Sequence, residues 1–564
     1  WTSEGGLTES DVMLDSPTNN FATFNSVNKD AAAVLSEGNL KLTNSVSGTV
    51  GARSTMAAAS GKYYVEFTPT IHGGNWPRVG INRANVASTQ TGMHPETYFD
   101  LQGGYCNNRG TAGATFSGFA TGDIGALAFN ADSGKIYLAK NGTWLNSGNP
   151  VNGTGYFFTS LTDGPFLFGS VQYHSANVIT FNFGQDSSFA GNKTPQGNSD
   201  ANGIGDFYYA PPAGFLALCT QNLPDATVIP SEHFNTVLYT GDGVDGRGIT
   251  GVGFKSDFVW DKARSATYYH HLFDVVRGVT KQLYSNATNA EGTYPDQLQS
   301  FDADGYTLGI GAGGGSNISG ITYASWNWKA GGSAVSNTNG TITSSVSANP
   351  AAGFSIVTYT GNGTAGATVG HGLSSVPTLV IAKSRTVSGK HWATYVESLG
   401  NTVRIDLESS GAKITGTGAW NSTTPTSSLV TIGSQSDVNT SGAGQLMYCF
   451  HSVDGYSKVG SYDGNLNDDG TFVHCGFKPA WVMIKRTENA DHWLIWDAKR
   501  NTFNVMDTAL KANDTSADSS DTAYRIDATS NGFKLRDDFG GINASETYIF
   551  LAFAESPFKH TNAR

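Results

Sequence analysis

Apolar and polar residues alternate in the first part of this chain with the period of two that a half-buried β-strand requires. Such runs occupy residues 62–67, 124–129 and 135–140, and the last is followed directly by Asn141-Gly142. Asn-Gly after an alternating run predicts a tight hairpin, because both residues tolerate the positive φ of a type I′ turn. No stretch in this part keeps a period of 3.6 residues. We therefore predict an all-β chain that begins with a β-sandwich.

One pattern occurs three times in the rest of the chain. A tyrosine that ends an apolar strand (Tyr239, Tyr359 or Tyr462) is followed by a glycine-rich turn and a second strand. The three tyrosines are 120 and 103 residues apart, which is the length of a small domain rather than of a solenoid repeat. We predict three related β-sandwich-type domains in tandem. Each copy also has an apolar strand that ends in lysine and is followed by arginine: Lys262 and Arg264, Lys383 and Arg385, Lys485 and Arg486.

These patterns predict the domain boundaries. The segments are an N-terminal connecting segment at 1–29, a β-sandwich at 30–206, a connector at 207–230, and repeats at 231–332, 353–453 and 454–560. Residues 331–352 are rich in Gly, Ser and Thr and are predicted to be a linker.

Composition narrows the class of protein. Glycine accounts for 70 of 564 residues, aromatic residues for 12% and charged residues for only 14%, which favours short packed strands joined by tight turns. The net charge of −12 and the lack of a basic run disfavour nucleic-acid binding. No apolar stretch approaches the ~18 residues needed to cross a membrane as a helix, so no membrane insertion is expected.

The four cysteines form no C-x-x-C pair, which excludes a zinc cage of the usual spacing. Cys449 and Cys475 lie in strands of neighbouring repeats, and a disulfide between them stays open. Four free buried thiols are the favoured interpretation.

The first region carries a family resemblance. Residues 122–144 (GDIGALAFNADSGKIYLAKNGTW) and 177–185 (NVITFNFGQ) resemble the SPRY domain, a concanavalin-like sandwich, and the match covers roughly residues 30–190. Segments 11–25 and 207–228, together with the repeats, resemble tail-fibre-like and other surface proteins of bacteriophage particles. This resemblance implies a virion surface protein, a homotrimer, and a first domain whose variable loops contact a partner.

Several motifs are weighed against ordinary structural roles. His391-Trp392 and His492-Trp493 could stack on sugars, but a shared fold also places aromatic residues in each core, and we favour that interpretation. The alternating acids and amides at 463–470 could bind calcium, yet the EF-hand glycine and glutamate are missing, which favours a turn. Residues 311–316 lack the lysine and helix of a phosphate-binding loop and are interpreted as a flexible loop.

No nucleophile elbow, metalloprotease motif or P-loop is present, so we do not expect an enzyme, a cofactor or a metal. The predicted function is a virion fibre or tail-tip protein that adheres without catalysis to a host-surface glycan or protein. Its other partners would be copies of itself and other virion proteins, and it would lie on the virion surface. A purely structural head-fibre or decoration protein and, less favoured, a polysaccharide depolymerase are the alternatives.

Specificity is expected in loops of the first domain, at 70–76 and 102–111. The candidate ligand-binding residues there are Trp76, Tyr105, Asn107, Asn108 and Arg109.

Overall fold

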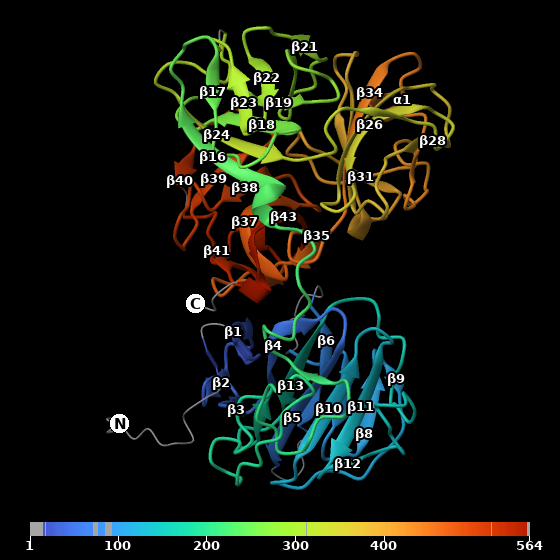
Figure 1. Cartoon of the computed structure of the whole chain (residues 1–564), viewed down its shortest axis with the longest axis vertical. Coiled ribbons are helices and arrows are strands. Elements are labelled where there is room, and N and C mark those ends of the chain that lie inside the picture. Colours follow the sequence, from blue (N-terminus) through green and yellow to red (C-terminus); the bar gives the residue numbers. More distant parts are fainter. Residues whose placement is uncertain are drawn as a thin grey trace. The chain divides into compact units, whose positions relative to one another are not determined.

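A computed structural model describes residues 15–16, 19–71, 77–84, 93–311, 313–520 and 522–560. Strands dominate this part of the chain, which forms two compact units (Figure 1). The first unit contains residues up to Asp225 with two short later segments, and the second contains Ala226–Gly470 and Phe477–Pro557. The predicted all-β fold is confirmed.

The first unit is a sandwich of two antiparallel sheets. Among the described residues one sheet has the order β1-β4-β13-β6-β7-β8-β9 and the other β12-β11-β10-β5-β14-β3-β2, with β15 added beside β5. Phenylalanines from the two inner faces, including Phe166 of the first sheet and Phe67 and Phe129 of the second, fill the core between the sheets. The strands are β1 (Phe24–Lys29), β2 (Ala33–Ser36), β3 (Lys41–Asn44), β4 (Val50–Ala58), β5 (Lys62–Thr70), β6 (Arg78–Arg83), β7 (Thr97–Asp100), β8 (Tyr105–Asn108), β9 (Thr111–Ala112), β10 (Gly125–Asn130), β11 (Lys135–Lys140), β12 (Thr143–Trp144), β13 (Phe166–Gln172), β14 (Val178–Asn182) and β15 (Leu216–Ala217).

The predicted hairpin lies between β11 and β12. Lys140 pairs with Thr143, and Asn141 and Gly142 have φ values of 48° and 78°, both positive as the predicted turn requires. The hairpin prediction is confirmed.

Two segments predicted to connect domains belong to the sandwich instead. Phe207 and Phe215 are fully buried against Tyr64 and Tyr137, and β15 pairs in parallel with β5. Strand β1, assigned to the N-terminal connecting segment, pairs with β4. The reason is that the second sheet is apolar on its outer face as well, so the chain folds back to cover it.

The second unit contains the three repeats, each built around one antiparallel sheet. The orders are β16-β24-β18-β19-β20-β21, then β25-β26-β27-β34-β29-β30-β31-β32, then β35-β43-β37-β38-β39-β40. The residues predicted as a linker form β25 and β26, which extend the second sheet, so that prediction is wrong. Their alternating Ser and Val residues suit a sheet edge despite the linker-like composition.

Each repeat adds short elements to its sheet. The first contains η2 (Pro230–Glu232), β16 (Phe234–Thr240), β17 (Arg247–Ile249), β18 (Phe258–Ala263), β19 (His270–Asp274), β20 (Lys281–Tyr284), β21 (Gly292–Thr293), β22 (Leu298–Asp302), β23 (Gly305–Leu308) and β24 (Thr322–Trp328). The second contains β25 (Val335–Asn337), β26 (Ser344–Asn349), β27 (Phe354–Thr360), β28 (Ala367–Gly370), β29 (Leu379–Ser384), β30 (Trp392–Val396), η3 (Glu397–Leu399), β31 (Val403–Asp406), β32 (Ile414–Thr415), β33 (Leu429–Ile432), α1 (Ser436–Asn439) and β34 (Gly444–Phe450). The last part of the chain contains β35 (Ser457–Asp463), β36 (Phe472–His474), β37 (Phe477–Arg486), β38 (Trp493–Asp497), β39 (Thr508–Lys511), β40 (Ser519–Ser520), β41 (Ile526–Thr529), β42 (Gly532–Leu535), α2 (Gly540–Asn543), β43 (Thr547–Pro557) and η4 (Phe558–His560).

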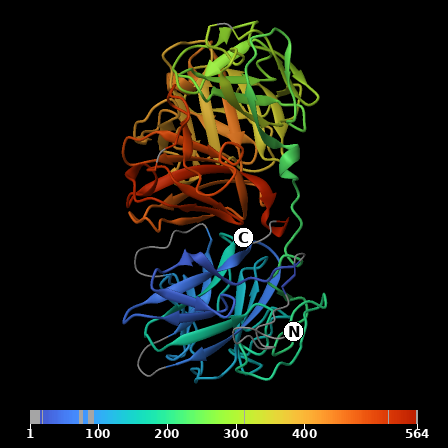
Figure 2. The same ribbon diagram turned by 90° about the vertical axis from the view of Figure 1, so that its left-hand side faces the viewer.

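The three repeats share one hydrophobic core. A single cluster of buried side chains includes Trp260 and Trp326 of the first repeat, Tyr448 of the second, and Trp481 and Phe553 of the third. The ribbons of the three repeats, green through yellow and orange to red, accordingly form one body (Figure 1 and Figure 2). Each repeat buries one face of its sheet against the other two.

Equivalent hydrogen bonds join the repeats in a closed ring. The indole nitrogen of Trp392 donates to the carbonyl oxygen of Tyr284 in the first repeat at 2.8 Å. The indole nitrogen of Trp493 donates to the carbonyl of Asp406 in the second repeat at 3.1 Å. At the same position in the first repeat, His270 Nε2 lies 3.0 Å from the carbonyl of Lys511 in the third. Each repeat is thus joined to the one before it, and the first is joined to the last.

The recurring lysines serve the same junctions. Lys262 donates to the carbonyl of Thr515 at 3.1 Å, Lys383 to that of Thr288 at 3.1 Å and Lys485 to that of Ser410 at 3.2 Å. Burial lowers the pKa of each of these three amines to about 8. The repeated lysines therefore have a structural role.

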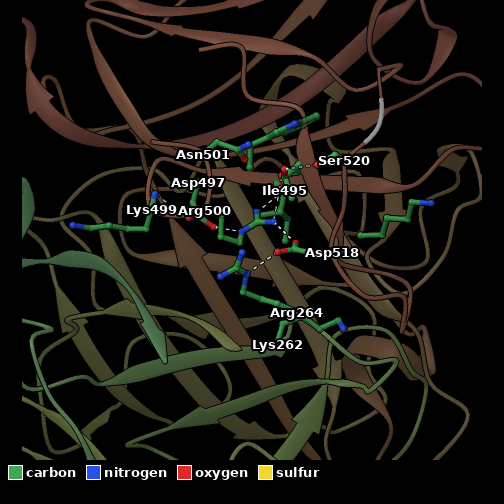
Figure 3. Close-up of polar contacts among 12 residues, drawn as sticks. Lys262, Arg264, Ile495, Asp497, Lys499, Arg500, Asn501, Asp518 and Ser520 are labelled. Carbon is green, nitrogen blue, oxygen red and sulfur yellow. Dashed lines mark hydrogen bonds and ion pairs between the residues drawn. The ribbon is translucent and has the colours of Figure 1, made fainter. Parts of the chain in front are cut away.

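A network of ion pairs joins the first and third repeats, and the pair that crosses between them is Arg264 with Asp518. Arg500 has a fully buried side chain that contacts Asp497 and donates to Asp518 at 2.7 Å, and Asp518 also accepts from Arg264 at 2.7 Å (Figure 3). The same oxygen of Asp497, Oδ2, that contacts Arg500 also accepts from the indole nitrogen of Trp326 at 3.1 Å. A network of charged groups therefore crosses this junction, and each charged side chain in it has an oppositely charged partner.

Candidate functional site

A cavity of about 260 Å³ lies at the edge of the first repeat. It is lined mainly by tyrosines, amides and glycines and has no carboxylate in its wall. The lining residues are Thr267, Tyr268, Tyr269, His271, Gln282, Tyr284, Tyr294, Gln297, Gly313, Gly314, Gly315 and Thr515.

Three strand ends position the aromatic wall. Tyr269 directly precedes β19, Tyr284 ends β20, and Tyr294 directly follows β21. The rings of Tyr269 and Tyr284 lie 4.8 Å apart between centroids at 42°. Tyr269 is 47% exposed and Tyr294 40%, which is unusual for tyrosines in a chain that buries most of its aromatic side chains. These two rings offer open faces to a ligand.

The polar groups of the cavity are neutral. Burial lowers the pKa of His271 to about 3, so its imidazole is uncharged at neutral pH. Its Nδ1 lies 3.0 Å from the hydroxyl of Ser316, whose backbone N–H donates to Gln297 Oε1 at 3.1 Å. Gln282 is 2% exposed, and its Oε1 has no hydrogen-bond partner. A buried acceptor of this kind favours a ligand or water that donates to it.

A glycine turn forms the opposite wall. A Cβ on Gly315 would lie 1.9 Å from Gln297 Oε1. Gly314 has a φ of +101°, and a Cβ added to it would lie 3.0 Å from the ring of Tyr268. Larger residues would close the cavity at this wall. The interpretation of this segment as merely a flexible loop is therefore replaced by a specific structural role for Gly314 and Gly315.

The site chemistry suits non-covalent binding. Open tyrosine faces can stack on the apolar face of a ligand, while buried amides fix its polar groups. Hydrolysis of a glycoside normally needs a pair of carboxyl groups, and the cavity wall supplies none. The serine beside His271, Ser316, is only 1% exposed.

The three repeats of the second unit correspond to one known family. A family model described as Domain of unknown function (DUF7483) matches residues 229–557, more than half of the chain. The chain belongs to this family. The DUF7483 region contains all three repeats, in agreement with their shared core.

Solved structures similar to the chain include two SPRY domains. The SPRY domain of human HERC1 is 20% identical over 28% of this chain and 96% of that one, with a TM-score of 0.24. The TRIM65 PSpry domain is 11% identical over 29% and 89%, with a TM-score of 0.22. The stonustoxin structure is 13% identical over 29% and 27%, with a TM-score of 0.22. The sandwich assignment itself rests on the two sheets of the first unit.

Comparison with curated proteins gives no match. Among the described residues, no helix has the length and apolar character to cross a membrane.

Four of the five residues predicted as ligand contacts lie on β8 or directly after it, outside the DUF7483 region. Tyr105 accepts a hydrogen bond from Arg78 at 2.8 Å, Asn107 from the backbone of Gly110 at 2.7 Å, and Asn108 from Thr97 at 2.9 Å. Arg109 forms two hydrogen bonds with Asp163, at 2.6 and 2.9 Å. The polar groups of these four residues are thus hydrogen-bonded within the first unit itself. Trp76 lies outside the described residues.

Near these residues, Arg78 stacks among three tyrosines that sequence reasoning did not connect. Its guanidinium carbon lies 4.3 Å from the ring centroid of Tyr98, 4.9 Å from Tyr173 and 5.9 Å from Tyr105. The guanidinium of Arg78 also pairs with Asp100 at 3.2 Å, so Arg78 itself is the cation that these tyrosine rings contact.

The other motifs have structural roles, as favoured from the sequence. Trp392 and Trp493 are buried in the shared core, so neither can stack on a sugar. Asn465 and Asn467 accept backbone N–H groups two residues on, as in ordinary Asx turns. All four cysteines are buried and none of them is in a disulfide, which answers the open question about Cys449 and Cys475.

The cavity could be recognised in the sequence only by differences among the repeats. Tyr269 and Tyr284 occupy positions that are His391 and Asp406 in the second repeat, because the registers of β19–β20 and β30–β31 correspond. A shared fold explains what the repeats have in common. Their differences at this edge identify the cavity.

Proposed function

We propose that this chain is a non-enzymatic carbohydrate-binding protein of a virion surface, and that the tyrosine-lined cavity of the first repeat holds part of a host-surface glycan. The observation that carries the proposal is the combination of exposed rings at Tyr269 and Tyr294 with the buried, unpartnered oxygen of Gln282.

A neutral sugar fits these groups chemically. One face of a pyranose ring is apolar and packs on an aromatic ring, while its hydroxyls donate to and accept from amides. Gln282 Oε1 would accept a sugar hydroxyl, and the neutral His271 adds no charge. Uncharged or weakly charged glycans are therefore preferred to phosphate-rich or strongly acidic ones.

The virion setting comes from the resemblance of the flanking segments and repeats to bacteriophage surface proteins. A shallow site with few polar contacts binds one sugar weakly, so several copies of the chain would be needed for firm attachment. The expected homotrimer would supply three such cavities on one particle component. Adhesion then depends on avidity rather than on one tight site.

The direct test is binding of the whole chain to an array of host-surface glycans. The wild type is expected to bind a subset of neutral glycans, and Tyr269→Ala is expected to weaken binding about tenfold or more. Tyr156→Ala is the matched control, because Tyr156 is an exposed tyrosine of the first unit, 37% exposed, far along the chain from the cavity. Equal binding by wild type and Tyr269→Ala would contradict the proposed site.

The same experiment separates the alternatives. A chain that binds no glycan or host cell yet remains attached to particles would favour the purely structural role. Release of soluble oligosaccharide from host polysaccharide would favour the depolymerase and overturn the non-enzymatic proposal.

A further inference from the structure

The edge that forms the cavity in the first repeat carries a different set of side chains in the second. Strand pairing of Ala393 with Asp406 corresponds to that of His271 with Tyr284 and of Leu494 with Lys511. One position accordingly holds Tyr269, His391 or His492, a second Tyr284, Asp406 or Lys511, and a third Asn286, Glu408 or Asn513.

From this juxtaposition we infer that His391, Asp406 and Glu408 form a binding site for a transition-type divalent cation such as Zn²⁺. One ligand atom from each of the three residues lies within 4.8 Å of the other two. His391 Nδ1 contacts Glu408 Oε1 directly and lies 3.7 Å from Asp406 Oδ2. In the repeat positions given above, His, Asp and Glu occur together only in the second repeat.

The buried carboxylate Asp406 supplies a second, independent indication. Its side chain is only 6% exposed, and its Oδ1 has no hydrogen-bond partner. A cation at the site would offset this unfavourable burial of charge and give the free oxygen a ligand.

Neighbouring residues hold the three ligands in place. Glu408 Oε2 accepts the backbone N–H of Trp392 at 2.9 Å, which leaves Oε1 toward His391. The backbone N–H of His391 donates to Asp437 Oδ1 at 2.8 Å. Arg404 bridges Asp437 at 2.7 Å and Asp406 Oδ2 at 3.4 Å. The Asp406 oxygen that lies 3.7 Å from His391 Nδ1 therefore already faces a fixed positive group, and Oδ1 is the oxygen without a hydrogen-bond partner.

The donor set selects the class of ion. An imidazole nitrogen with two carboxylate oxygens suits Zn²⁺ and similar ions, whereas Ca²⁺ and Mg²⁺ prefer oxygen ligands alone. Three protein ligands leave a further coordination position to solvent, and His391 is about half exposed at 46%.

The repeats also supply the variant that tests the site. Glu408→Asn keeps a backbone cap, because Asn513 caps Trp493 at 2.9 Å and Asn286 caps His270 at 3.0 Å at the same position. It removes the carboxylate. His492→Ala is the matched control. His492 occupies the position of His391 in the third repeat and contacts Asn513, but Lys511 and Asn513 replace the two carboxylates there.

The experiment is calorimetric titration of the chelator-treated whole chain with ZnCl₂, accompanied by the visible spectrum of the Co²⁺ form. One Zn²⁺ per chain is expected for the wild type and for His492→Ala, and affinity should fall by more than about tenfold in Glu408→Asn and His391→Ala. Circular dichroism checks that the variants are folded, and Asp406→Asn provides a second test if one is not. Absence of binding by the wild type, or equal binding by wild type and Glu408→Asn, would overturn the inference.

Discussion

The indole N–H of Trp392 donates to the backbone carbonyl of Tyr284, 2.8 Å away in the preceding repeat. Tyr284 also supplies a wall of the cavity, so the residue that joins two repeats also helps to build the proposed binding site. The same junction recurs at Trp493 and His270. Function is therefore expected at edges that the shared core holds rigid.

Replacement of Trp392 should destabilise the whole second unit. Trp392 is fully buried, and truncation of a buried tryptophan costs about 3–5 kcal/mol. We expect Trp392→Ala to lower the free energy of unfolding in urea by this amount, while Trp392→His, the residue type at His270, should cost less. Equal, small effects of both variants would show that the junction contributes little.

The repeats should not fold separately. Their sheets bury a common core, in which Phe354 and Tyr448 of the second repeat pack against Phe258 of the first. A chain of residues 333–453 alone would therefore expose Phe354 and Tyr448 to water. Residues 226–557 should give dispersed NMR spectra and one cooperative unfolding transition, and residues 333–453 should not. A stably folded single repeat would contradict the shared core.

Alternation and turn chemistry were sufficient to predict strands β5, β10 and β11, the Asn141-Gly142 hairpin and the threefold repeat. The shared core could not be predicted, since an apolar strand has the same pattern whether its partner lies in its own repeat or in another. Phe207 and Phe215 lie in a short segment interrupted by Pro211, Pro212 and Gly214, so no period marks them as cover for a sheet.

The candidate site was harder to predict than the fold. Its tyrosines come from the ends of separate strands, and only the strand register brings Tyr269 beside Tyr284. Shared residues such as Lys262 and Trp392 attract attention in a repeat alignment, yet they build the junctions. The candidate site is instead built from residues that differ between the repeats, such as Tyr269 and Tyr284.

Removal of a charge from the buried network in Figure 3 should be costly. Asp497 and Arg500 both have fully buried side chains, and a buried pair that loses one partner costs about 3–5 kcal/mol. Asp497→Asn should lower the free energy of unfolding by this order. Glu555→Gln, whose pair with Lys478 is exposed, should change it by no more than about 1 kcal/mol. Similar losses in the two variants would contradict the assigned burial.

Stability of the first unit should depend on the protonation of Glu66. Burial raises the pKa of this carboxyl from 4.5 to about 7. Between these values the folded state holds a proton that the unfolded state has lost, so the stability contributed by Glu66 is present below pH 4.5 and is lost as the pH rises toward about 7. The loss is on the order of 3 kcal/mol.

Glu66→Gln should remove this dependence. Denaturation of the two proteins at several pH values from 4 to 8 measures it. The wild type should lose stability relative to the variant across this range. Parallel pH profiles would mean that Glu66 does not titrate as described.

Calorimetric titration with a neutral oligosaccharide selected from the glycan array tests the central claim most directly. The wild type and Tyr156→Ala should bind it with the same affinity, and Tyr269→Ala and Tyr294→Ala should each bind about tenfold more weakly or worse. Unchanged affinity in both cavity variants, with the folded state intact, would contradict a glycan site at this edge of the first repeat.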